Sequence, residues 1–306
     1  MFTASGVKLA SPALFGYKLA ALLSRKLSRK VGLRVASFLG RAISRIDKKR
    51  RNQVIRNAAR LNDSELSRKE VNDFIYQTFE SYAHYWLNTF RLIDMTEDEL
   101  ESTFSHDGWE LIERAIQEDP GVILVLPHLG AWDWGGFWIS KIKGVPVSAV
   151  VEPLEPPELF EWFKRSRNDL GMEIIPVGPD AGSQVLKAMS EKQIIVLVSD
   201  RDVGGSSVEV EFFGEKTLLP AGPATIALRT GATLLPVAIY NKADGCHGVV
   251  RPAISLERKG KFRSDVKRIT QTIAEEMEFL IRKAPEQWHL MQPNWPSDSK
   301  SEKGRI

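Results

Sequence analysis

From about residue 108 onward, the chain alternates between stretches with apolar residues at helical spacing and short, nearly unbroken apolar runs. The helical stretches predict helices over 108–118, 133–142, 157–170, 181–190, 221–230 and 264–283. The apolar or alternating runs predict strands over 121–126, 146–151, 173–176, 193–198, 207–213, 233–239 and 248–255. This order predicts the α/β class, with a mixed β-sheet core flanked by helices.

The first hundred residues follow a helical pattern without such strands. Residues 14–46 predict an amphipathic helix, and residues 69–92 predict a second helix that is rich in aromatic side chains. No repeat, linker or low-complexity tract divides the chain. We therefore expect a single domain over 1–306, built from a helical region (1–100), a catalytic α/β core (105–295) and a frayed polar tail (297–306).

Charge changes the interpretation of the N-terminal region. The net charge is only +3, but residues 1–60 contain 15 lysines and arginines and one acidic residue, Asp47. Basic residues beside an apolar stripe predict that residues 8–51 bind an anionic membrane surface. A surface helix that packs its apolar stripe on the protein's own core is the alternative. The cluster Lys48–Arg51 lacks a nucleic-acid recognition motif, so we expect no nucleic acid partner.

The segment from Gly121 to Gly136 carries the most informative chemistry. His128 follows a predicted strand and Pro127, and Asp133 comes five residues later where a helix begins. A histidine can take up a proton near pH 7, and a nearby carboxylate can orient its ring and stabilise its cation. The pattern predicts a catalytic His128–Asp133 pair; the alternative is an exposed loop histidine beside a helix-capping aspartate.

Several other chemistries lose support because their motifs are absent. The sequence contains no phosphate-binding P-loop, no G-x-G-x-x-G, no G-x-S-x-G and no H-E-x-x-H. The single cysteine, Cys246, excludes an intramolecular disulfide. We expect no metal ion and no bound cofactor.

Five sequence blocks together resemble a known family. They are His128-Leu-Gly-Ala-Trp-Asp133, Ser199-Asp-Arg-Asp202, Phe212-Phe-Gly214, Leu219-Pro-Ala-Gly222 and Pro285-Glu-Gln-Trp-His289. In this order they resemble the lipid A biosynthesis acyltransferase family, which shares the H-x4-D motif and includes the actinobacterial phosphatidylinositol mannoside acyltransferases. The tryptophan-rich segment with Asp133 is most similar to the mannoside branch.

The resemblance implies a membrane-associated enzyme. It implies transfer of a palmitoyl chain from acyl-CoA to a sugar hydroxyl of a phosphatidylinositol mannoside, at the cytoplasmic face of the inner membrane. His128 would act as general base, Asp133 would orient it, and backbone amides of the Gly-rich turn could bind the oxyanion. A lipid A-type lauroyl or myristoyl transferase and a non-catalytic lipid-binding protein remain the alternatives.

Cationic and acidic side chains elsewhere are candidates for substrate binding. Arg167 and Arg165 could bind substrate phosphates through their guanidinium groups, and the resemblance favours Arg167. Glu152, past another strand end, could bind a sugar hydroxyl or restrain Arg167.

Further candidates follow later in the chain. By the resemblance, Asp200, Arg201 and Asp202 are expected to frame the cleft, and Asp202 could either contact His128 or pair with Arg201. Glu209 could face the site or water. His289 matches the closing block, although a packing role suits a histidine beside a tryptophan.

Overall fold

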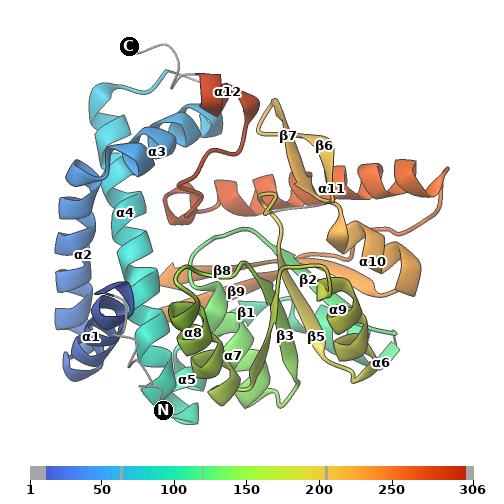
Figure 1. The fold of residues 1–306 in the computed structure, drawn as a ribbon, viewed down its shortest axis with the longest axis horizontal. Coiled ribbons are helices and arrows are strands. Elements are labelled where there is room, and N and C mark those ends of the chain that lie inside the picture. The colour runs from blue at the N-terminus through green and yellow to red at the C-terminus, as the bar shows by residue number, and fades with distance from the viewer. Residues whose placement is uncertain (1–11, 63–64, 119, 204–205, 301–306) are drawn as a thin grey trace, which may run out of the picture.

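The computed structural model describes residues 12–62, 65–118, 120–203 and 206–300. Its centre is a seven-stranded sheet in the order β1-β9-β8-β2-β5-β3-β4 (Figure 1). Neighbouring strands run parallel except β8 and β9, and β6 pairs with β7 in a separate antiparallel hairpin. The strands are β1 (Phe104–Asp107), β2 (Val122–Leu126), β3 (Val147–Val151), β4 (Met172–Pro176), β5 (Ile194–Val198), β6 (Ser207–Phe212), β7 (Glu215–Pro220), β8 (Thr233–Lys242) and β9 (Gly245–Val250). The predicted mixed α/β class is confirmed.

Helices cover both faces of this sheet. Strand β2 is buried along its whole length because Ile123 and Val125 pack toward α9, α10 and α11, while Leu124 and Leu126 pack toward α6 and α7. These helices and their neighbours are α5 (Glu97–Ser102), α6 (Trp109–Glu118), α7 (Trp132–Ile142), α8 (Pro157–Asp169), α9 (Ala181–Ser190), α10 (Gly222–Thr230) and α11 (Phe262–Arg282). The apolar runs of the sequence therefore correspond to strands that helices cover on both faces of the sheet.

The N-terminal helices α1 (Pro12–Lys26), α2 (Arg29–Ile46), α3 (Lys48–Leu61) and α4 (Arg68–Arg91) gather at one side of the sheet (Figure 1). The predicted helix 69–92 is confirmed as α4. The predicted helix 14–46 is instead two helices, because Arg91 donates hydrogen bonds to the carbonyls of Ser24 and Leu27 and so satisfies the end of α1. No helix within the described ranges is long and apolar enough to cross a membrane.

The apolar stripe of α2 faces outward. The buried face of α2 consists of the small residues Gly32, Ala36, Gly40 and Ser44, which lie against α4. A Cβ atom at Gly40 would lie 2.6 Å from the carbonyl oxygen of Phe79, so only glycine allows this approach. Phe38 and Ile46 are consequently 72% and 79% exposed. The alternative in which this stripe packs on the protein's own core is wrong.

The C-terminal region also differs from expectation. We expected a frayed tail over 297–306, but residues 296–300 form helix α12 (Pro296–Lys300), and the side chain of Asp298 is fully buried. Its carboxylate accepts hydrogen bonds from Gln53 and Arg60 of α3 and from the backbone amide of Asn294. These donors compensate the burial of its charge. Residues 301–306 lie outside the described part, as do residues 8–11 of the predicted membrane-binding segment.

Three strands departed from the sequence pattern. The predicted strand 248–255 is β9 (Gly245–Val250), which begins and ends earlier. Strand β1, Phe-Ser-His-Asp, is short, lies at the edge of the sheet and is largely exposed, so it carries no apolar run. The hairpin strand β7 alternates weakly and was also not predicted.

Candidate active site

The ends of two neighbouring strands bring together a histidine and an aspartate. Strands β2 and β5 are parallel partners, and Leu126 at the end of β2 lies opposite Val198 at the end of β5. His128 comes two residues after Leu126, and Asp200 comes two residues after Val198. Equal offsets from paired positions place both side chains at the same edge of the sheet.

The contact between them is direct. The distance from His128 Nδ1 to Asp200 Oδ1 is 2.6 Å, and the backbone amide of His128 donates to Asp200 Oδ2 at 3.0 Å. Trp288 Nε1 donates to the same Oδ2 at 2.8 Å. Burial of Asp200 opposes its ionisation, but the charge of His128 and these hydrogen bonds lower the pKa of its carboxyl group overall.

This contact determines which nitrogen of His128 is reactive. A neutral imidazole that faces a carboxylate through Nδ1 carries its proton there and leaves Nε2 as an acceptor. Nε2 has no hydrogen-bond partner in the described part of the chain, and the side chain is 32% exposed. His128 can therefore accept a proton from a group bound in front of it.

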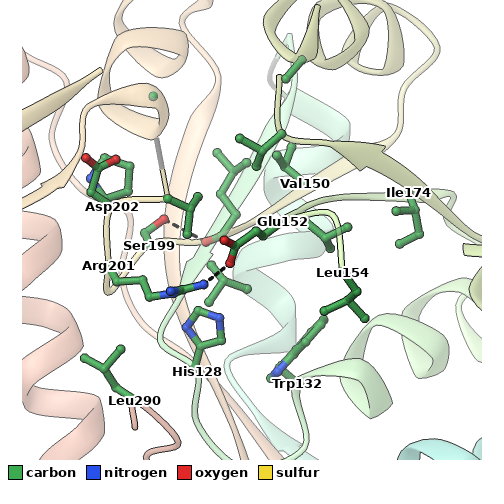
Figure 2. A pocket seen from close by; sticks show the side chains of 18 of the residues that line it. His128, Trp132, Val150, Glu152, Leu154, Ile174, Ser199, Arg201, Asp202 and Leu290 are labelled. Atoms are coloured by element: carbon green, nitrogen blue, oxygen red, sulfur yellow. Dashed lines mark hydrogen bonds and ion pairs between the residues drawn. The ribbon is translucent and has the colours of Figure 1, made fainter. Parts of the chain in front are cut away.

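His128 lines a cavity of about 500 Å³ (Figure 2). One part of the wall is aromatic, with Tyr82, Tyr85, Trp86, Trp132, Phe160 and Phe163. Another part is aliphatic, with Val150, Val151, Ile174, Val177, Val185, Leu197 and Ile226. A cavity of this kind suits a ligand with long apolar chains and one polar reacting group.

Asp133, the expected partner of His128, has a different position. Its carboxylate is buried and accepts two hydrogen bonds from Arg167, Nε at 3.1 Å and Nη2 at 2.8 Å. Tyr85 Oη also donates to it at 2.9 Å, and Thr89 lies at 3.4 Å. Asp133 thus joins α7 to α8 and α4. The contact to the His128 ring that we expected from Asp133 is made by Asp200, because Asp133 lies in the first turn of α7 and faces those two helices.

Arg167 keeps its charge inside the protein. Burial on its own would lower the pKa of Arg167, but the adjacent Asp133 carboxylate and Tyr85 raise it above its usual value. Burial, together with the charge of Asp133, raises the pKa of Tyr85 well above 10, so Tyr85 remains a hydrogen-bond donor.

The predicted phosphate-binding arginines occupy different environments. Arg167 lines the cavity, but its guanidinium already forms the bidentate pair with Asp133. Arg165 is exposed, does not line the cavity, and donates to the carbonyl of Glu161 in its own helix. Two cations that the sequence analysis missed, Arg50 and Lys164, do line it.

The acidic and basic residues at the end of β5 frame the cavity as expected. Arg201, Asp202 and Glu152 all line it, and Figure 2 shows the His128 ring beneath the Arg201–Glu152 pair. Arg201 donates hydrogen bonds to Glu152 and to Gln292. Glu152 therefore restrains Arg201 rather than Arg167. The carboxylate contact to His128 that we considered for Asp202 is made by Asp200.

The last two candidates lie differently from each other. Glu209 faces water on β6 and pairs with Lys216 across the hairpin at 3.1 Å, away from the cavity. His289 lines the cavity, and its Nε2 lies 2.9 Å from Ser81 Oγ. Burial and the nearby charge of His128 lower the pKa of His289 to about 3, so its ring is neutral.

Backbone amides after His128 are already in use. Leu129 N donates to the carbonyl of Pro127, Gly130 N to that of Gln287, and Ala131 N to that of Ile239. These amides are therefore poor candidates for an oxyanion site, contrary to our expectation for the Gly-rich turn. Within the part of the chain that the structure describes, no three or more His, Cys, Asp or Glu side chains are arranged to hold a metal ion.

Comparison with known proteins agrees with the sequence blocks. The sequence model of the bacterial lipid A biosynthesis acyltransferase family matches residues 13–297 of the chain. The chain is also similar to two phosphatidylinositol mannoside acyltransferases. It is 35% identical to that of Mycolicibacterium smegmatis over 235 residues, which are 76% of this chain and 75% of the relative. It is 34% identical to that of Mycobacterium tuberculosis over 226 residues, which are 72% of this chain and 70% of the relative. The lipid A biosynthesis palmitoleoyltransferase of Escherichia coli is 25% identical over 264 residues, 83% and 82% of the two chains. The resemblance predicted from the blocks is confirmed.

Proposed function

The chain belongs to the bacterial lipid A biosynthesis acyltransferase family and is an acyltransferase, and from this premise we propose that it transfers a palmitoyl chain from acyl-CoA to a sugar hydroxyl of a phosphatidylinositol mannoside. The higher identity to enzymes named for this glycolipid, 35% against 25% for a lipid A enzyme, supports the acceptor. The observation that carries the chemistry is a histidine held through Nδ1 by buried Asp200, with Nε2 open to an apolar cavity.

In the proposed reaction, His128 Nε2 removes the proton of the acceptor hydroxyl while that oxygen attacks the thioester carbonyl. The tetrahedral intermediate collapses, its carbon–sulfur bond breaks, and the imidazolium returns the proton to the departing CoA thiolate. Asp200, which lies 2.6 Å from Nδ1, stabilises the imidazolium between these steps. No covalent acyl-enzyme is required, in keeping with the absence of the G-x-S-x-G motif that would supply a nucleophilic serine.

Arg50 and Lys164 are our candidates for contact with substrate phosphate. Both line the cavity together with the aromatic side chains of α4 and α8. Lys164 makes no ion pair among the described residues, and Arg50 pairs only loosely with Asp47, at 3.5 Å. Arg167, in contrast, is neutralised by Asp133. A phosphodiester could replace water on the first two cations without breaking a buried ion pair.

We also propose that α1 and α2 bind the protein to the membrane surface. Their exposed apolar side chains are Phe15, Leu19, Leu22, Leu23, Val31, Val35, Phe38, Leu39, Ile43 and Ile46. Basic residues flank this surface. Helix α3 follows directly after α2, and Arg50 in its first turn lines the cavity. Such a surface combines apolar insertion with attraction to anionic lipids. An acceptor lipid in the bilayer would thereby lie close to the site.

The direct test is an acyl-transfer assay with labelled palmitoyl-CoA. The protein is incubated with a phosphatidylinositol mannoside or with a lipid A precursor, and the lipids are separated by thin-layer chromatography. We expect label in the mannoside and none with folded His128→Ala. Label in the lipid A precursor alone would assign the alternative acceptor, and no label in either, with lipid binding retained, would favour a non-catalytic protein.

A further inference from the structure

We propose that Trp288 is a positioning residue of this site. Its indole N–H holds the Asp200 carboxylate in the orientation that accepts the hydrogen bond from His128 Nδ1. This inference rests on the proposed function of His128 as the base. Trp288 does not line the cavity, so it would act through Asp200 rather than on a substrate.

The first support is the way in which the two carboxylate oxygens are used. Oδ2 accepts from Trp288 Nε1 at 2.8 Å and from the backbone amide of His128 at 3.0 Å, which leaves Oδ1 for His128 Nδ1 at 2.6 Å. Two donors on one oxygen fix the rotation of the carboxylate. Without the indole donor, a single backbone amide would hold Oδ2, and the carboxylate could turn away from Nδ1.

The second support is that the same segment fixes the loop that carries His128. Leu129 and Trp288 form an isolated antiparallel bridge. The amide of His289 donates to the carbonyl of His128 at 2.8 Å, and the amide of Gly130 donates to the carbonyl of Gln287 at 2.9 Å. Both members of the His128–Asp200 pair are thus held by one short stretch of chain.

The third support is the rigidity of the indole itself. Trp288 is buried and packs edge-on against Phe212 and Trp295, with ring centroids 6.0 and 6.3 Å apart, and against Phe213 at 5.4 Å. Phenylalanine could supply this packing. Only the N–H group requires tryptophan at this position, because a buried carboxylate that loses a donor bears a large desolvation cost.

A matched pair of variants separates positioning from packing. Trp295→Phe is the control, because Trp295 is equally buried in the same aromatic cluster but donates its Nε1 to the carbonyl of Phe212 and not to Asp200. We expect Trp288→Phe to lower kcat at least about tenfold with KM changed less than about twofold. We expect Trp295→Phe to retain most of the turnover.

The pH profile provides a readout that a packing role would not move. A carboxylate that has turned away from Nδ1 no longer stabilises the imidazolium, so the acidic limb of kcat/KM should move down by about half a pH unit in Trp288→Phe alone. Benzothienylalanine at position 288 replaces the N–H by sulfur and keeps the ring shape. It should reproduce the shift even if Trp288→Phe folds poorly.

Proton NMR of the His128 Nδ1–H gives a result that needs no substrate. We expect this resonance to shift in the position-288 variants and to stay in Trp295→Phe. If the position-288 variants match the control in turnover, pH profile and resonance, Trp288 is only a packing residue. If His128→Ala is itself active, the proposed function fails instead, and the two failures remain distinguishable.

Discussion

His128 and Asp200 lie 72 positions apart in the chain, and yet their side chains are 2.6 Å apart, whereas Asp133, five positions from His128, is bonded to Arg167. We predict that Asp200→Asn lowers kcat at least about a hundredfold, because the amide cannot stabilise the imidazolium that forms during transfer. Steady-state kinetics with labelled palmitoyl-CoA measure this effect.

The control for this prediction is a double variant. His128→Ala and Asp200→Asn act on one proton transfer, so combining them should cost little more than His128→Ala alone. Circular dichroism checks that each variant is folded. Additive losses would show that Asp200 acts independently of His128.

A second prediction concerns the stability contributed by Asp133 and Arg167. Removal of one member leaves the other charged and buried, so Asp133→Ala and Arg167→Ala should each lower the free energy of unfolding by about 3–5 kcal/mol. The double variant should lose much less than the sum of the two. Urea denaturation gives these values.

The exposed pair Glu209–Lys216 supplies the control for that experiment. Its side chains are half or more exposed, so Glu209→Ala should change the free energy of unfolding by less than about 1 kcal/mol. If Asp133→Ala were equally mild, the ion pair between α7 and α8 would not be a determinant of the fold.

The sequence predicted the α/β class and most strands because runs buried on two faces are almost wholly apolar, as in β2. It placed His128 at a strand end for the same reason. It placed Asp200 among the residues that frame the cleft but missed its contact with His128, because nearness along the chain favoured Asp133, while nearness in space depends on which strands are neighbours. A usable signal was present: Val122–Leu126 and Ile194–Val198 are each five apolar residues followed, two positions on, by His128 and Asp200.

In helix α2 the sequence pattern shows an apolar face but does not show which face is buried. The large apolar residues form the exposed stripe, because close packing on α4 requires small residues and not large ones. The buried face at Gly32, Ala36, Gly40 and Ser44 recurs every four residues. No hydrophobicity pattern marks such a face, and the carbonyl of Phe79 near Gly40 shows why it is there.

A third prediction tests the phosphate contact. Arg50→Gln should raise KM for the phosphate-bearing substrate about five- to tenfold with little change in kcat, since phosphate is bound before and during the reaction. Arg165→Gln removes the same charge from a residue outside the cavity and should leave KM unchanged. Equal effects of the two variants would indicate general electrostatic attraction rather than a contact.

A fourth prediction concerns pH and stability. Burial lowers the pKa of His289 to about 3, whereas an unfolded histidine titrates near 6.5, so the unfolded chain binds the additional proton between these values. Stability contributed by neutral His289 is therefore present above about pH 6.5 and is lost on acidification. Between pH 7 and 5 this loss is at most about 2 kcal/mol. His289→Gln should flatten that part of the stability curve in urea titrations, and an unchanged slope would contradict the assignment.

The last prediction concerns the outward face of α2. Phe38 and Ile46 are exposed and lie outside the hydrophobic core of the described residues, so Phe38→Ser with Ile46→Ser should leave folding intact and reduce flotation with vesicles that contain phosphatidylinositol. Turnover of water-soluble short-chain substrates should persist. Arg25 and Arg29 are unsuitable for this test, because Arg25 pairs with Asp94 and Arg29 lies 3.7 Å from Asp244.

Leu186 and Leu218 provide the control on another surface, because they are exposed apolar side chains, at 50% and 52%, on α9 and β7. Their replacement by serine removes exposed apolar area away from α2 and should leave flotation unchanged. Added salt should weaken flotation of the parent protein, since each basic residue near anionic lipid contributes about 1 kcal/mol. If both pairs of substitutions reduced flotation equally, binding would depend on total exposed apolar area and not on α2. The protein would then have no specific membrane-binding surface.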